Sequence, residues 1–464
     1  MPATLARSRK RLHRGGLTGA FAAVAAMVAI AATPAHADGH TVIRDAEIEA
    51  TLRSYVDPIF VAANLDPSQI EVVILQDNSI NAFVTNSRTM FIHTGLISAV
   101  ESPNELKGVM AHETGHMAGG HVLRSREAMS QAMVPAMLSV GIGILAIAAG
   151  APSAGAALIA GSQQFAMADF VQFSQAQESQ ADQAAITFMD AAGQSGEGLV
   201  SFASRQFRYN EMRSAQRVPP WMRTHPLWTD RIQALRQRVS QSEHRTATDT
   251  PEEIEHLKLI QAKLFGYTEN AARTYQKYPD TDLSAPARYA RSVAAMRSSD
   301  FGRADKEAET LTREFPNNPY YHELVGEILL TSGRVADSVP HHRRALELNP
   351  GNALLQINLA RALLATNQKP ATDEAVGFLQ AATRTEPDNA SAWYELATAY
   401  DTRGEEGMAR LASAELRFSV GDWPAARSFA ERAKERLDQG TTSYQRALDI
   451  ATIAETRVRE GRRG

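Results

Sequence analysis

The feature that most constrains the fold of this 464-residue chain is a repeat in its C-terminal half. Pro316, Pro350 and Pro387 each follow a helical pattern, and they are spaced 34 and 37 residues apart. Small residues recur at fixed positions before each proline, which indicates helices that approach one another closely. A unit of this length is a pair of helices that cannot bury its apolar face alone, so neighbouring units must stack into an α-solenoid.

The residues of these units occupy the positions expected of tetratricopeptide repeats. The second unit carries Gly326, Leu329, Gly333, Ala345 and Pro350, the third carries Leu359, Ala360, Leu363, Ala375, Ala382 and Pro387, and the fourth carries Trp393, Leu396, Ala397, Tyr400, Gly404 and Ala409. We therefore predict a tetratricopeptide-repeat domain over residues 250–464 that binds a protein partner. An unrelated all-helical bundle is the alternative.

The N-terminus has the pattern of a secretory signal peptide over residues 1–37. These residues hold five Lys/Arg and no acid, and an uncharged stretch leads to the small-x-small sequence Ala35-His36-Ala37. We expect cleavage after Ala37, and the alternative is an uncleaved membrane anchor.

Charge and cysteine content narrow the class of protein further. Removing the five positive charges of the signal peptide changes the formal net charge from −4 to −9. A chain this acidic lacks the basic surface that phosphate binding requires, so we expect no nucleic-acid partner. The chain has no Cys, so stability must come from packed cores rather than disulfides.

Residues 38–245 mix short strands with helices, which predicts an α+β domain in a chain that is mainly α. The segments 71–75 and 90–94 have the composition of strands. A helix should follow from Pro103 to about Glu127, because Ser102 is a good N-cap and Glu105 completes a capping box. A second helix is predicted from about 170 to 192, and the polar run 240–250 marks the domain boundary.

The first of these helices carries the sequence His112-Glu113-Thr114-Gly115-His116. Residues four apart lie on one face of a helix, so the two imidazoles can bind one Zn²⁺. Zinc lowers the pKa of a bound water to about 7, and Glu113 beside the first histidine can take the proton of that water. The motif therefore predicts a zinc peptidase with one zinc per chain.

A catalytic zinc needs a third protein ligand, and the second helix offers Glu178. Asp182 lies one turn further on, where it could accept the second N–H of a ligand histidine. The alternative for this pair is a solvated helix face. His121 is a rival ligand, but it lies five residues past His116 and about 140° around a continuous helix, so a structural or supporting role is the competing interpretation.

His225 precedes Pro226 in a Pro- and Trp-rich loop that spans residues 219–230. Its imidazole could cap the zinc or stabilise the oxyanion of the transition state. An ordinary loop histidine is the alternative.

The uncharged stretch 128–168 breaks at Gly150-Ala151-Pro152-Ser153. This break predicts two apolar segments joined by a turn. A hairpin that packs over the site or rests on a membrane surface is one interpretation, and a true membrane span is the other.

Together these residues resemble the zinc peptidase superfamily that includes the CAAX prenyl proteases and HtpX. The matching motifs are Asn81-Ala82-Phe83, Thr94-Gly95-Leu96, His112-Glu113-x-x-His116, Glu178-x-x-Ala181-Asp182 and His225-Pro226. Export combined with C-terminal repeats is similar to the periplasmic branch of that superfamily. The resemblance implies a gluzincin fold, Glu178 as the third zinc ligand and Asp182 behind a ligand histidine. The chain departs from the superfamily at Gln177 and Gln180, where acids are common.

The resemblance also implies work on outer-membrane protein assembly and quality control. The expected substrates are misfolded or unassembled envelope proteins, and the outer-membrane assembly machinery is the expected partner of the repeats. The alternative function is a repeat-based chaperone or adaptor whose peptidase site is mostly closed.

Overall fold

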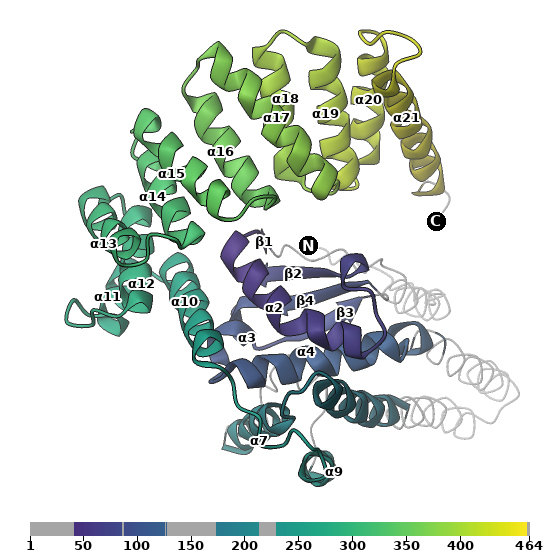
Figure 1. Ribbon diagram of the computed structural model, residues 1–464. Helices are drawn as coiled ribbons and strands as arrows, with labels where there is room; N and C mark the ends of the chain where they lie inside the picture. Colours follow the sequence, from purple (N-terminus) through teal and green to yellow (C-terminus); the bar gives the residue numbers. More distant parts are fainter. Residues whose placement is uncertain (1–40, 86–87, 126, 128–172, 213–228, 462–464) are drawn as a thin grey trace, which may run out of the picture. The chain divides into compact units, whose positions relative to one another are not determined.

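The computed structural model describes residues 41–85, 88–125, 127, 173–212 and 229–461 (Figure 1). These residues form an α+β domain followed by an array of helical repeats, which confirms the predicted fold class. The predicted signal peptide, the apolar stretch 128–168 and His225 lie outside the described residues. Within the described ranges, no helix is both long and apolar enough to cross a membrane.

The α+β domain contains a four-stranded sheet with the strand order β1-β2-β4-β3. Its strands are β1 (Thr41–Ile43), β2 (Glu71–Gln76), β3 (Ala82–Thr85) and β4 (Thr89–His93). Strand β2 pairs in parallel with β4, and β3 pairs antiparallel with it. Both strands predicted from the sequence are therefore present, and they are neighbours.

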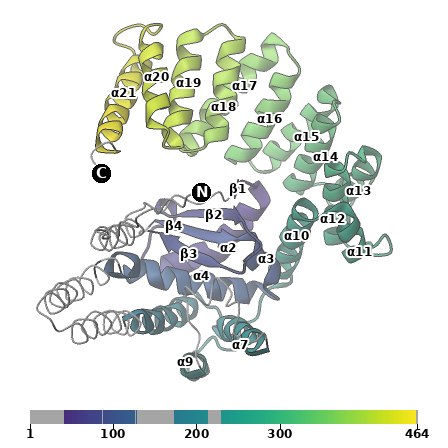
Figure 2. The ribbon, with the colours of Figure 1, turned by 180° about the vertical axis from the view of Figure 1, so that it is seen from behind.

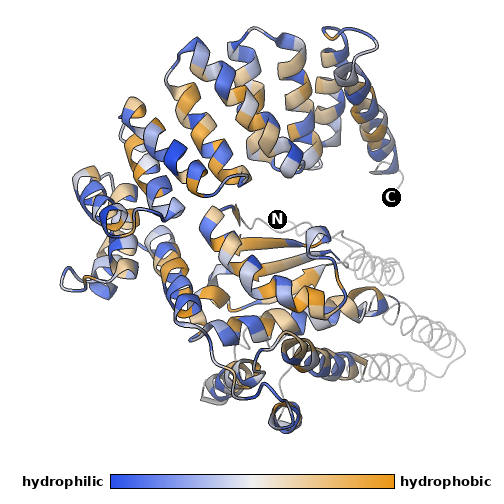
Figure 3. Ribbon diagram, viewed as in Figure 1, coloured by the Kyte–Doolittle hydropathy of each residue, from blue (hydrophilic) through white to orange (hydrophobic). Residues whose placement is uncertain are grey.

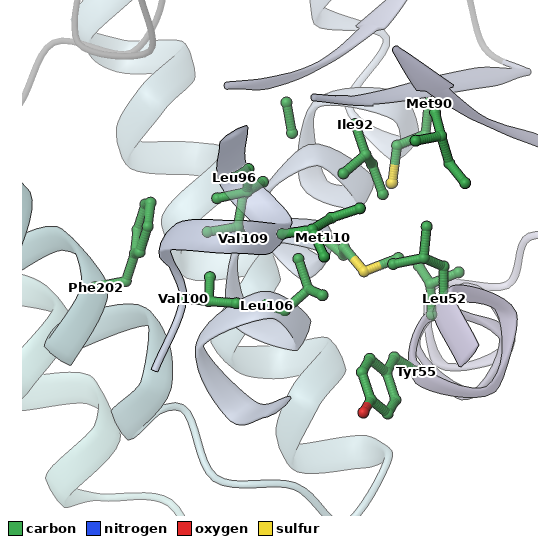
Figure 4. Close-up of a cluster of buried hydrophobic side chains, with 14 of the residues drawn as sticks. Leu52, Tyr55, Met90, Ile92, Leu96, Val100, Leu106, Val109, Met110 and Phe202 are labelled. Atoms are coloured by element: carbon green, nitrogen blue, oxygen red, sulfur yellow. The ribbon is translucent and has the colours of Figure 1, made fainter. Parts of the chain in front are cut away.

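Helices supply the rest of the domain, because the sheet alone cannot enclose a core. They include α2 (Ala46–Ala62), the 3-10 turn η1 (Pro67–Gln69), α3 (Thr94–Ala99) and α4 (Pro103–Ala118). The main core joins Leu52 and Tyr55 of α2, Met90 and Ile92 of β4, and Leu106, Val109 and Met110 of α4 (Figure 4). Helix α4 is thus anchored on one side by apolar packing and presents the histidine motif on another.

The first turn of α4 forms largely as predicted. The Ser102 side chain accepts the backbone N–H of Glu105, and Pro103 occupies the first turn. The Glu105 carboxylate, however, accepts the N–H of Glu101 at 2.8 Å, one residue before the N-cap. The capping box is therefore only half formed.

The predicted C-terminal end of this helix is wrong. Helix α4 ends at Ala118, and Gly120 has a φ of +62°, in the left-handed region that favours glycine. A new helical segment starts at His121. The Gly119-Gly120 turn breaks what would otherwise be one helix to Glu127, so the angle of 140° estimated for His121 does not apply.

Three further helices complete the domain. They are the helix 173–191, α7 (Glu197–Met212) and α9 (Thr229–Ser240). Helix α7 packs against α4, and α9 packs against α7. Gly108 allows α4 to approach α7, because a Cβ atom there would lie 2.7 Å from the backbone nitrogen of Leu199. Gly193, the predicted C-cap of the second helix, has a φ of +73° just beyond its end.

The C-terminal part consists of consecutive helices. They are α10 (Pro251–Thr268), α11 (Ala271–Lys277), α12 (Ala285–Arg297), α13 (Phe301–Glu314), α14 (Pro319–Thr331), α15 (Val335–Leu348), α16 (Ala353–Ala365), α17 (Lys369–Thr385), α18 (Ala390–Thr402), α19 (Glu406–Ser419), α20 (Trp423–Lys434) and α21 (Thr442–Gly461). Each helix from α14 onward packs against the next along the chain, as the views from both sides show (Figures 1 and 2). Pro316, Pro350 and Pro387 each lie just after a helix, as predicted.

Small residues bring the paired helices together. A Cβ atom on Gly326 of α14 would lie 2.8 Å from the His342 ring of α15. Helix α13 illustrates the amphipathic pattern, since Ala304, Glu307, Ala308 and Leu311 are buried at helical spacing. The same alternation of apolar and hydrophilic faces is visible along the other helices (Figure 3).

Helix α10 belongs to two cores. Leu257, Ile260 and Leu264 lie in the core of the α+β domain, and Leu259 lies in the first core of the repeats. A capping box of Thr250 and Glu253 starts the helix. The division at residues 245 and 250 remains a prediction, and α10 is the element that both parts share.

Candidate metal centre

His112 and His116 lie on one face of α4, one turn apart, and both are buried. Their Nε2 atoms are 3.1 Å apart, and the two rings are nearly perpendicular, with an interplanar angle of 74°. Two nitrogens so close and so oriented can share one cation between them.

Glu178, on the helix 173–191, completes a triangle of ligand atoms. Its Oε2 atom is 3.4 Å from His112 Nε2, and its Oε1 atom is 3.2 Å from His116 Nε2. The three residues form a buried group that could hold a metal ion, with ligand atoms within 4.8 Å of one another. Sequence analysis predicted this set, and the fold brings its members together across more than 60 residues of chain.

The donor set and its spacing suit zinc. Atoms that bind one tetrahedral zinc at about 2.0–2.1 Å lie about 3.3–3.4 Å from one another. The three observed separations, 3.1, 3.2 and 3.4 Å, are close to this value. Two imidazoles and a carboxylate also leave a fourth position open, as catalytic zinc sites require.

Asp182 orients the first histidine. Its Oδ1 atom lies 2.9 Å from His112 Nδ1. A neutral imidazole has one donor and one acceptor nitrogen, so donation from Nδ1 leaves the lone pair of Nε2 facing the triangle. Asp182 and Glu178 are four residues apart, on the same face of their helix.

Arg231 is a site residue that sequence analysis did not identify. Its Nε donates to Asp182 Oδ2 at 2.6 Å, its Nη2 to Asp182 Oδ1 at 2.8 Å, and its Nη1 to Glu178 Oε2 at 2.8 Å. The guanidinium therefore spans both carboxylates and is only 4% exposed. A signal was present, because Arg231 shares the apolar face of α9 with Leu235 and Val239.

These charges shift the pKa values of the site in opposite directions. Burial lowers the pKa of His112, but the hydrogen bonds and charges of Asp182 and Glu178 outweigh burial and raise this pKa to about 10. Burial raises the pKa of Asp182, but the His112 hydrogen bond and the Arg231 charge hold it below its ordinary value. The site thus has a strong attraction for positive charge at His112 Nε2.

The other predicted site residues have different outcomes. Glu113 lies between the two histidines in sequence and is 1% exposed. His121 is outside the ligand triangle, because its ring contacts His116 at Nδ1 rather than at Nε2. His225 lies outside the described residues.

Known proteins share this organisation. Residues 44–239 match peptidase family M48, and residues 289–353 match the tetratricopeptide repeat. The putative beta-barrel assembly-enhancing protease of Vibrio cholerae is 26% identical over 407 residues, which cover 86% of this chain and 83% of that protein. The beta-barrel assembly-enhancing protease of Escherichia coli strain K12 is 25% identical over 403 residues, with 85% and 80% covered.

A further relative matches a shorter stretch of the chain. The metalloprotease LoiP of Escherichia coli strain K12 is 26% identical over 182 residues, which cover 38% of this chain and 66% of that protein. The buried ligand triangle lies within the residues that match family M48. The chain is therefore a metalloprotease in which residues 44–239 match peptidase family M48, and C-terminal tetratricopeptide repeats follow them.

Proposed function

We propose that this chain is a zinc-dependent endopeptidase of the cell envelope, with His112, His116 and Glu178 as zinc ligands and Glu113 as general base. The observation that carries the proposal is the buried triangle of two imidazole nitrogens and one carboxylate, spaced as a tetrahedral zinc requires.

Each residue of the site has a distinct role in this proposal. Zinc bound there supplies a Lewis acid and lowers the pKa of water to about 7. Glu113 takes the proton of the attacking water and returns it to the leaving amine. Asp182 fixes the tautomer of His112, and Arg231 donates to both neighbouring carboxylates and holds the pKa of Asp182 below its ordinary value.

The cellular role follows from the relatives. The Vibrio cholerae and Escherichia coli proteins are named as proteases that enhance β-barrel assembly. We propose the same work for this chain, in the periplasm after cleavage at Ala37. Its substrates would be misfolded or unassembled envelope proteins. Residues 38–245 would carry out proteolysis. Residues 250–464 would bind the outer-membrane assembly machinery. The stretch 128–168 would make peripheral contact with the membrane.

His225 completes the proposal as a residue that faces the zinc. A neutral imidazole is a competent ligand for the fourth zinc position, and Pro226 favours an extended backbone at His225. If His225 caps the zinc at rest, His225→Ala raises basal proteolysis. If it stabilises the oxyanion instead, the same change lowers turnover by about 10²–10³-fold.

The test compares the full mature protein with its Glu113→Gln variant, using an unfolded outer-membrane β-barrel protein as substrate and measuring zinc content in parallel. The variant should keep its zinc and lose about 10²–10⁴-fold in cleavage rate, the usual size of a lost general base. Equal cleavage by both proteins would exclude Glu113 from catalysis. If neither protein cleaves but both promote insertion of the β-barrel into vesicles, the adaptor function replaces the peptidase.

A further inference from the structure

The second ligand histidine has a buried partner on the side away from the metal position. His116 directs Nε2 toward His112 and Glu178, and its Nδ1 lies 3.0 Å from Nδ1 of His121. The His121 side chain is 3% exposed, and the two rings meet edge to face at an interplanar angle of 82°. This contact parallels the one that Asp182 makes with His112.

The chemistry of imidazole allows one arrangement of hydrogens in which His116 can bind a metal through Nε2. The Nε2 lone pair of a neutral ring is available only when the hydrogen is on Nδ1, and that N–H must then find an acceptor. His121 Nδ1 lies within hydrogen-bond distance of that N–H, and it accepts only when the hydrogen of His121 is on its own Nε2. The tautomer of His121 therefore favours one tautomer of His116 over the other.

The same helix that supplies Glu178 holds His121 in this state. Gln177 donates to the backbone oxygen of His121 at 3.2 Å, and the side chain of Gln180 interacts with the His121 ring. Since Nδ1 of that ring faces His116, its Nε2 is the nitrogen left for Gln180. An amide oxygen at position 180 can accept that N–H, which would fix the required tautomer.

The turn before His121 fits the ring closely. A Cβ atom on Gly119 would lie 2.4 Å from His121 Nε2, so a side chain at this position would displace the ring. Gly120, in the left-handed region, then reverses the chain and brings the ring of residue 121 back under His116. Gly119 and Gly120 thus shape the turn before His121, and Gln177 and Gln180 lie beside the same residue.

We propose that His121 is a positioning residue that holds His116 in the metal-binding tautomer, with Gln180 as its outer hydrogen-bond partner. The inference rests on the proposed metal site. In this proposal the two ligand histidines have different hydrogen-bond partners. The carboxylate of Asp182 orients His112, and the neutral side chains of His121 and Gln180 orient His116.

The experiment measures the zinc affinity of the full mature protein by competition with a chelator, for the wild type, His121→Asn and His121→Leu. Asn places its side-chain oxygen close to the position of His Nδ1, and Leu has nearly the shape of Asn but no acceptor. The Leu variant should bind zinc about 10–100-fold more weakly, the usual effect of losing such a support, while the Asn variant stays close to the wild type. Equal affinities of the two variants would overturn the proposal.

A second measurement separates positioning from simple structural support. The unfolding temperature is recorded with and without zinc, with His342→Leu, a buried histidine in the repeats, as the control. The control should lower both temperatures and keep the gain from zinc, whereas His121→Leu should reduce that gain. A His121→Leu variant that keeps the full gain would overturn the inference.

A third variant, Gln180→Ala, tests the proposed hydrogen-bond partner of His121 without disturbing the core, because residue 180 is exposed. It should weaken zinc binding less than His121→Leu does, and an unchanged affinity would exclude Gln180 as the partner of His121 and overturn the inference even if His121→Leu fails to fold. A wild-type protein that binds no zinc would instead overturn the proposed function itself.

Discussion

The backbone of Gly115 lies directly against that of Ala181. A Cβ atom on Gly115 would be 2.7 Å from the carbonyl oxygen of Ala181 and 3.0 Å from its Cα. Gly115 precedes His116 on α4, and Ala181 precedes Asp182 on the helix 173–191. This close approach therefore sets the distance between the histidines and the carboxylates.

A methyl group at Gly115 should push the two helices apart. We expect Gly115→Ala to cost about 1–3 kcal/mol, the usual penalty of overpacking, and to weaken zinc binding because the ligand triangle opens. Gly302→Ala in α13 is the matched control, since a Cβ atom there meets nothing within 4 Å. The control should stabilise its helix by up to about 1 kcal/mol and leave zinc affinity unchanged. Equal zinc affinities in both variants would show that this contact does not control the site.

The guanidinium of Arg231 should stabilise the folded protein, because it lies between two buried carboxylates and bears the opposite charge. We expect Arg231→Met to lower stability by about 3–5 kcal/mol, because Glu178 and Asp182 lose the cation that they share. Arg231→Lys should recover only part of this loss, because one ammonium group lacks the planar fork that spans both carboxylates.

The measurement is urea unfolding of the zinc-free protein, with Arg238→Met on the same helix as control. Arg238 is exposed and donates to Thr187, so its loss should have little effect. A similar small effect of both methionine variants would contradict the role assigned to Arg231.

Much of the site was predictable from the sequence, for reasons that are local. Ser102 and Pro103 predict the start of α4. The spacing of His112 and His116 places both side chains on one face of that helix. The sequence around Glu178 does not specify that its side chain contacts the two histidines, because this contact depends on how the two helices cross. The need for a third ligand makes Glu178 a candidate, and the superfamily resemblance supports the same assignment.

The errors also have physical causes. The helix predicted from Pro103 to about Glu127 runs past Gly119-Gly120, although two glycines in succession are a common stop signal. Arg231 was overlooked because its partners lie on another helix, even though an arginine on an apolar face indicates a buried ion pair. The apolar residues of α10 lie on more than one face, which indicates a helix buried on two sides, but its sequence does not specify which elements cover each face.

Lowering the pH should destabilise the repeat that contains His342. Burial lowers the pKa of His342 to about 4, and the nearby charge of Arg361 adds to the effect. Its ordinary value is 6.5, so the unfolded chain binds the proton more readily, and stability is lost as the pH falls from 6.5 toward 4. We expect a loss of about 2 kcal/mol between pH 7 and pH 5.

Amide hydrogen exchange of α14 and α15 at the two pH values, corrected for intrinsic rates, measures this loss. His342→Leu does not titrate at this position, so its protection should change less with pH than that of the wild type. The same pH dependence in both proteins would mean that His342 is not the responsible group.

The zinc content of the purified full-length mature protein tests the central claim most directly. The wild type and Glu113→Gln should each hold about one zinc per chain, because Glu113 is assigned to water rather than to metal, and His116→Ala should lose the metal. A His116→Ala protein that retains one zinc per chain would contradict the ligand set of His112, His116 and Glu178.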